Sequence, residues 1–285
     1  MYNSSMIILS YIFYFLVATI APIQRRWLSV KNEGGNKIDL SFKVTLVSSL
    51  LILILPLFSP FELHGSWLKI TLLLIASSVG GMGYYISYFT AQRHVEAGVT
   101  SVLGNTYVPI TILLSTVFLG EGLKGLQIIG VLLLITAMVI VSKKHKIGKM
   151  KYDKYFWLMI FSGISLSILL VASRELMKIT GFTASLILSW WAICIGLGIL
   201  AFFSKGKTTY TKKDLVITGF LKFIQDLSWG MLTFFVANLS LVSSITTFKV
   251  VIMFIVAAIF LKEKDGIWRK IFGSLIAVIG LLLMR

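Results

Sequence analysis

Charged side chains are scarce in this sequence. Only 13% of its 285 residues are Asp, Glu, Lys or Arg, whereas 57% are hydrophobic, and the mean hydropathy is +0.92. In an average soluble domain about 25% of the residues are charged. The composition therefore excludes a soluble domain and predicts a polytopic protein of the lipid bilayer.

Residues that hold metals or form disulfides are equally scarce. The single cysteine, Cys194, excludes an intramolecular disulfide. The three histidines, His64, His94 and His145, are far apart in the sequence and show no metal-ligand spacing. The sequence contains no motif that would place a nucleophilic side chain beside a candidate general base. We therefore expect neither an enzyme nor a metal site.

Acidic residues are outnumbered by basic ones, 11 against 27, which gives a formal net charge of +16. The basic residues cluster in short loops between apolar runs, as topology signals do. No soluble segment is long enough to hold a nucleic-acid-binding domain, so we do not expect nucleic acid as a partner.

The apolar runs are long enough to cross a bilayer. One strongly polar linker, residues 143–154, divides the chain into a first half, residues 1–142, and a second half, residues 155–285. The fold predicted is all-α, with ten transmembrane helices in two inverted five-helix repeats. The ten spans expected are Met6–Pro22, Ser41–Phe58, Trp67–Thr90, Gly98–Leu119, Leu123–Ser142, Tyr155–Leu176, Thr183–Ser204, Leu215–Val236, Leu241–Leu261 and Ile267–Met284.

The two halves resemble each other in sequence. Thr100–Gln127 aligns with Val242–Arg269 without a gap, and the alignment places Glu121 on Glu263 and Tyr107 on Lys249. Because each repeat has an odd number of spans, the second enters the membrane from the opposite side. Inverted repeats are typical of secondary transporters, whose binding site lies near the midplane where the halves meet.

Both repeats carry a span that ends in LGE (Leu119–Glu121) or LKE (Leu261–Glu263), followed by a tight turn and a glycine-containing span. With Asn105, Tyr107 and Pro109 upstream, this pattern resembles the EamA-type family of the drug/metabolite transporter superfamily. The resemblance implies a carrier in the inner membrane of a prokaryote that exports small metabolites without a cofactor. Membership is compatible with a monomer or a homodimer.

The charge distribution and the resemblance disagree on orientation. Twenty of the 27 Lys and Arg fall in the loops after spans one, three, five, seven and nine or in the first four residues of the span that follows. The positive-inside rule places these loops in the cytoplasm and both termini outside, whereas the resemblance places both termini inside. We favour the charge count here.

Three charged residues lie well inside expected spans, away from the span ends, where a charge costs about 3 kcal/mol even on lenient insertion scales. Lys222 and Asp226 share one helix face with Trp229, and Gln225 lies beside them. Lys249 falls near the middle of the ninth span, one turn after Thr246.

Together these groups leave one positive charge in excess. We expect Lys249 to attract an anionic metabolite, a carboxylate or a phosphate, and Asp226 to take up or release a proton. The alternative is structural: a Lys222–Asp226 ion pair that ties helices together, with Lys249 extending toward the membrane surface.

Other polar residues are weaker candidates. Small and hydroxyl residues form stripes in spans three and four that could line a cavity or allow close helix packing. Arg174 and Glu175 at the end of span six are read as an interfacial ion pair or a gate, and Glu121 and Glu263 as carboxylates near helix N-termini. The further substrate-binding candidates are Tyr84, Tyr88, Asn105, Tyr107 and Thr111.

The sequence thus predicts a carrier that moves a small organic solute by alternating access, with a cavity between spans three, four, eight and nine and contributions from six. The alternatives are a non-transporting scaffold or partner subunit and a lipid translocase.

Overall fold

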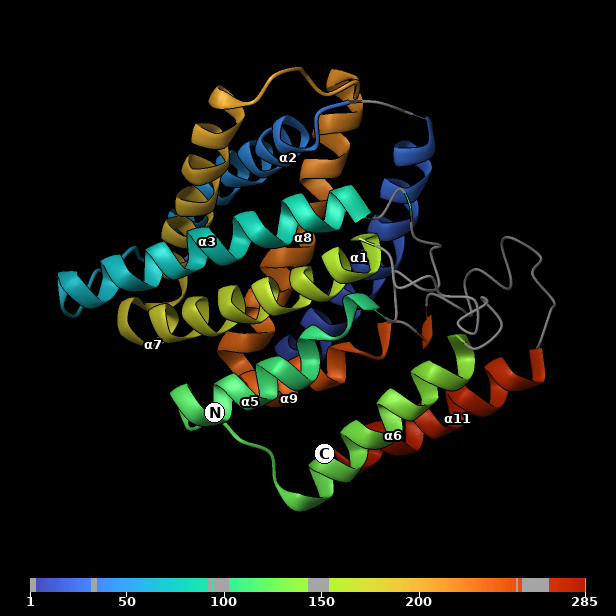
Figure 1. Cartoon of the computed structure of the whole chain (residues 1–285). Helices are drawn as coiled ribbons and strands as arrows, with labels where there is room; N and C mark the ends of the chain where they lie inside the picture. Colours follow the sequence, from blue (N-terminus) through green and yellow to red (C-terminus); the bar gives the residue numbers. More distant parts are fainter. Residues whose placement is uncertain are drawn as a thin grey trace.

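The computed structural model describes residues 4–31, 35–91, 94, 103–142, 154–249, 251–252 and 267–284 (Figure 1). These residues contain helices and loops but no strand, so the predicted all-α class is confirmed for them. The elements are α1 (Ser4–Lys31), α2 (Lys37–Leu51), the 3-10 helix η1 (Ile52–Leu57), α3 (Trp67–Ala91), α5 (Tyr107–Leu119), α6 (Gly125–Ser142), α7 (Lys154–Phe203), α8 (Lys212–Val236), α9 (Leu239–Thr246) and α11 (Ile267–Leu283).

Helix α7 has 50 residues, and about 1.5 Å of rise per residue would make it far longer than a bilayer is thick. The helix is broken at Gly181, whose φ of 76° lies in the left-handed region that favours glycine. The chain turns there, so that residues 154–180 and 182–203 form two separate rods. The sixth and seventh expected spans fall in these two parts.

Small residues allow α3 to lie directly against both parts of α7 (Figure 1). A Cβ at Gly80 would lie 2.8 Å from the backbone nitrogen of Leu169 and 2.8 Å from the backbone oxygen of Ser165. A Cβ at Gly81 would lie 2.6 Å from the Ile193 side chain in the second part. The small residues of span three therefore serve close packing, as membrane helix interfaces require.

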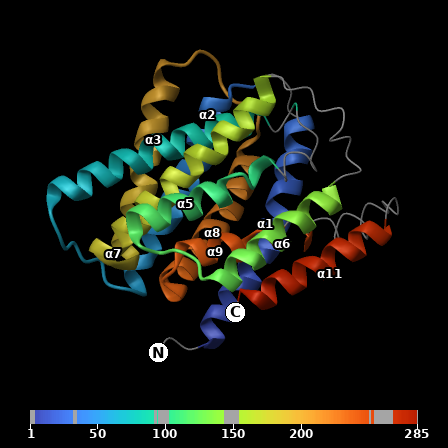
Figure 2. The same ribbon diagram turned by 60° about the horizontal axis from the view of Figure 1, so that its bottom comes forward.

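Helices α6 and α11 form an antiparallel pair at one edge of the bundle (Figure 2). They approach closely where Gly130 faces Gly280 and Met284. The remaining helices surround a central region: α1 and α2 pack against α8, α5 packs against α7, and α9 packs against α5 and α8.

Four helical stretches are long and apolar enough to cross a membrane, namely Lys37–Leu57, Trp67–Ala91, Lys154–Phe203 and Lys212–Val236. Shorter apolar helices occupy four more of the expected spans, at Ser5–Ala21, Tyr107–Leu119, Gly125–Ala137 and Ile271–Leu283. Much of the ninth expected span, the start of the fourth and nearly all of the linker at 143–154 lie outside the described residues. The count of ten spans and the division into halves stay predictions.

Candidate functional site

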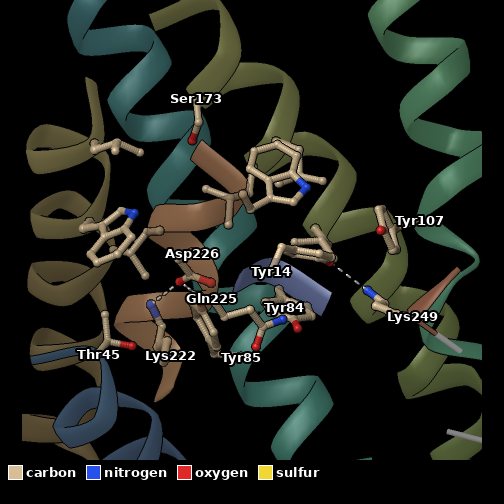
Figure 3. A pocket seen from close by; sticks show the side chains of 17 residues that line it. Tyr14, Thr45, Tyr84, Tyr85, Tyr107, Ser173, Lys222, Gln225, Asp226 and Lys249 are labelled. Carbon is tan, nitrogen blue, oxygen red and sulfur yellow. Dashed lines mark hydrogen bonds and ion pairs between the residues drawn. The ribbon is translucent and has the colours of Figure 1, made fainter. Parts of the chain in front are cut away.

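A cavity of about 110 Å³ lies at the centre of the bundle (Figure 3). One water molecule needs roughly 10–15 Å³ of such space, so the cavity can hold several waters or a small solute. Its lining comes from both halves of the chain and consists of Tyr14, Thr45, Tyr84, Tyr85, Tyr107, Leu166, Leu169, Leu170, Ser173, Leu186, Trp190, Ile193, Lys222, Gln225, Asp226, Trp229 and Lys249.

One end of the cavity holds an ion pair on α8. Lys222 Nζ donates to Asp226 Oδ2 at 2.6 Å, across one helical turn. Tyr85 OH on α3 donates to the same oxygen at 3.3 Å. The Lys222 side chain is 6% exposed and the Asp226 side chain 29%, so the carboxylate is the more accessible partner.

Aromatic rings cover the ammonium of this pair. Lys222 Nζ lies 4.8 Å from the centre of the Tyr85 ring and 4.7 Å from that of Trp190, within the range of cation–π attraction. Both partners belong to α8, so the pair itself does not tie two helices together. The ion pair predicted by the structural alternative, between Lys222 and Asp226, is present. It is Tyr85 on α3 that links this pair to another helix.

Lys249 lies on the other side of the cavity from this pair (Figure 3). Its Nζ donates to Tyr14 OH at 3.3 Å and lies 5.2 Å from the centre of the Tyr107 ring. Among the described residues, no carboxylate forms a salt bridge with it. Because Lys249 faces the cavity, the structural alternative in which it extends toward the membrane surface does not hold.

Several residues at or beside the cavity were not singled out from the sequence as site residues, and Arg25 and Thr45 are two of them. Arg25, counted there only as a loop charge, is 8% exposed, and its Nη2 donates to Gln225 Oε1 at 2.9 Å. Thr45 on α2 lines the cavity with a buried hydroxyl that has no hydrogen-bond partner in the described part of the chain. Neither residue breaks a local pattern, so the sequence held no signal for them.

Of the predicted binding residues, seven line the cavity: Tyr84, Tyr107, Lys222, Gln225, Asp226, Trp229 and Lys249. The other four, Tyr88, Asn105, Thr111 and Thr246, are not part of the lining. The Thr246 hydroxyl lies 3.4 Å from Tyr107 OH, and Thr111 donates to Ser167 at 3.0 Å. Tyr88 packs against Tyr84, with their ring centres 5.5 Å apart. Thr246 and Tyr88 thus support lining side chains from behind.

The gate candidates form ion pairs with separate partners. Arg174 Nε donates to Glu121 Oε1 at 2.9 Å, while Glu175 Oε1 accepts from Lys69 Nζ at 2.6 Å. The expected ion pair between Arg174 and Glu175 is therefore wrong. Adjacent residues on a helix point about 100° apart, which directs these two side chains to different neighbours.

Glu121 links several elements. Its carboxylate also accepts from Lys178 Nζ at 2.9 Å and from the backbone N–H of Leu239 at 2.7 Å. Sequence reasoning associated Glu121 with the helix that follows it, but the amide it binds opens α9. Burial raises the pKa of the Glu121 carboxyl, yet hydrogen bonds from Arg174, Leu239 and Lys178 outweigh burial and bring it below the usual value. Its repeat partner Glu263 lies outside the described residues.

Comparisons with known proteins agree with this architecture. Residues 4–143 match the model of the EamA-like transporter family. A protein of known crystal structure shares 13% identity with this chain, superposes with a TM-score of 0.70, and is matched over 99% of this chain and 96% of its own. At that identity the likeness shows the fold alone. No curated protein sequence gave a significant match.

Proposed function

This chain belongs to the EamA-like transporter family, and we propose that it moves a small organic metabolite through the central cavity by alternating access. Members of this family are integral multi-pass membrane transporters of the drug/metabolite superfamily. The observation that supports this most directly is Lys249, a cation on the cavity wall without a salt bridge to any described carboxylate. A buried charge is costly unless a partner offsets it, and a transported solute can be that partner.

The cavity also distinguishes the carrier from its alternatives. A scaffold gains nothing from charged side chains around an open interior, because each costs free energy to keep in the membrane. A lipid translocase needs an apolar route for acyl chains, whereas Lys222, Gln225, Asp226 and Lys249 make this lining polar. The arrangement favours a polar solute.

Asp226 is the proposed proton carrier, because it is the one carboxylate among the described residues that line the cavity. It faces Lys222 on its own helix and Tyr85 on α3, and Arg25 approaches through Gln225. Protonation would free Lys222 to interact with the solute, which would couple proton movement to solute binding. We propose export or exchange in the plasma membrane as the direction and place of transport.

The Glu121 network is the proposed gate. Glu121 belongs to the first half of the sequence, whereas Arg174, Lys178 and Leu239 belong to the second. These bonds hold the halves together where α5 ends and α9 begins. Opening the cavity at this end requires Glu121 to separate from its partners.

Counterflow into proteoliposomes, with a panel of radiolabelled metabolites, tests the function. We expect accumulation of at least one small polar metabolite by the native chain, loss of that uptake in Lys249→Met, and retention in Lys212→Met, which removes a charge from the exposed start of α8. Lys249→Met that transports as well as the native chain would remove the basis of this proposal.

A further inference from the structure

The charges of the cavity do not balance. Among the described residues, its lining contains two ammonium groups, from Lys222 and Lys249, and one carboxylate, from Asp226. Lys222 and Asp226 neutralise each other at 2.6 Å. One positive charge, on Lys249, is left for the solute to offset.

The phenol of Tyr14 cannot supply that charge, since a neutral hydroxyl only shares a hydrogen bond with the ammonium. A carboxylate can bind Lys249 with a charge-assisted hydrogen bond, the stronger kind. A solute with one net negative charge would neutralise the described lining, and the Arg25 guanidinium lies behind Gln225 rather than on the cavity wall.

A cationic group on the solute is disfavoured in the same cavity. The carboxylate that could receive it in the described part of the lining is Asp226, whose Oδ2 already accepts from both Lys222 and Tyr85. An additional ammonium there would lie close to the Lys222 ammonium and would be repelled by it. The geometry therefore discriminates against amines and against zwitterions of no net charge.

Aromatic side chains supply much of the remaining wall. Tyr14, Tyr84, Tyr85, Tyr107, Trp190 and Trp229 all line the cavity. Figure 3 shows Tyr14 and Tyr84 between the Lys222–Asp226 pair and Lys249. Trp229 packs with the clusters that contain Tyr14 and Tyr107, so it lies toward the Lys249 end. Aromatic rings pair favourably with other rings, edge to face or offset.

We propose that the solute is a small monocarboxylate with an aromatic ring and no amino group. Its carboxylate binds Lys249, and its ring lies against the aromatic wall beside Trp229. This assignment rests on the proposed function, because it names the solute that the proposed carrier moves.

A matched set of four probes tests each part of the assignment. 3-Phenylpropanoate carries the ring and the carboxylate, phenylalanine adds only an amino group, 2-phenylethylamine replaces the acid by an amine, and 3-cyclohexylpropanoate removes the aromaticity. Binding to the purified full chain in detergent is measured by isothermal titration calorimetry, with Lys249→Met and Lys212→Met in parallel.

We expect 3-phenylpropanoate to bind at least about tenfold more tightly than phenylalanine and 2-phenylethylamine, a difference of about 1.4 kcal/mol, and several-fold more tightly than 3-cyclohexylpropanoate. Lys249→Met should abolish the preference for 3-phenylpropanoate over 2-phenylethylamine and Lys212→Met should keep it, while thermal melting shows both variants folded. Equal or tighter binding of phenylalanine, equal binding of the cyclohexyl compound, or no binding of any probe would each overturn the assignment. The proposed function is judged separately, since counterflow of another metabolite would still show a carrier.

Discussion

Arg174 and Glu121 face each other across the two halves of the chain, with Arg174 Nε 2.9 Å from one carboxylate oxygen of Glu121 and 3.3 Å from the other. Their side chains are 7% and 9% exposed. Few ion pairs are so buried, and breaking such a pair on one side commonly costs about 3–5 kcal/mol, because the other charge is left without a partner.

Glu121→Gln should therefore lower the thermal stability of the protein in detergent, and Arg174→Met combined with it should recover part of the loss. The recovery follows because the double variant leaves no buried guanidinium unpaired. Melting curves of the single and double variants check this. A double variant less stable than Glu121→Gln alone would show that the pair is not the source of the effect.

The same pair predicts a pH dependence with a definite sign. Because the folded-state pKa of Glu121 lies below its usual value, its stabilisation is present above the pKa of an unfolded glutamate, about 4.3. It is lost as the pH falls through the lower folded-state pKa. The difference in melting temperature between the native chain and Glu121→Gln should stay constant from pH 8 to about pH 5 and shrink only below that. A difference that grows on acidification has the wrong sign for this account.

Asp226→Asn tests the proton role. Counterflow by the native chain should vary with pH, and the Asn variant should transport at a rate that no longer responds to pH between about 5 and 8, because its amide does not titrate. Asp214→Asn is the matched control, since Asp214 lies at the exposed start of α8. Unchanged pH dependence in Asp226→Asn would assign proton coupling elsewhere.

Gly80 gives a test of the fold that does not depend on function. A methyl group at Gly80 would collide with the backbone of α7. A methyl group at Gly125, in contrast, would have no other atom within 4 Å. We expect Gly80→Ala to be destabilised by about 1–3 kcal/mol, the cost of overpacking, and Gly125→Ala to be nearly neutral. Thermal melting of both variants distinguishes them, and equal effects would contradict the close packing of α3 on α7.

Sequence reasoning found the site where charge conflicted with its surroundings. Lys222, Asp226 and Lys249 are conspicuous in apolar runs, and the repeat alignment that placed Lys249 on Tyr107 predicted two residues that both line the cavity. The cost of a charge in lipid makes such residues informative without any structure.

The remaining contacts join residues that no local pattern connects. Arg25 meets Gln225 across 200 positions, and Arg174 meets Glu121 across 53. The partners of these side chains depend on how the helices rotate and cross, which the periodicity of a single helix does not specify. The contributions of α1, α2 and the second part of α7 to the cavity were missed for the same reason.

The central claim is that the charged residues surround a hollow which opens to water. It is tested most directly by placing a cysteine at Ser173, a half-buried position on the cavity wall, in a chain whose single native cysteine is removed by Cys194→Ala. A charged, membrane-impermeant thiosulfonate should label Cys at position 173 in proteoliposomes, and a transported metabolite should slow the labelling. A cysteine that stays unlabelled from both sides of the membrane, in a variant that still folds, would contradict the account.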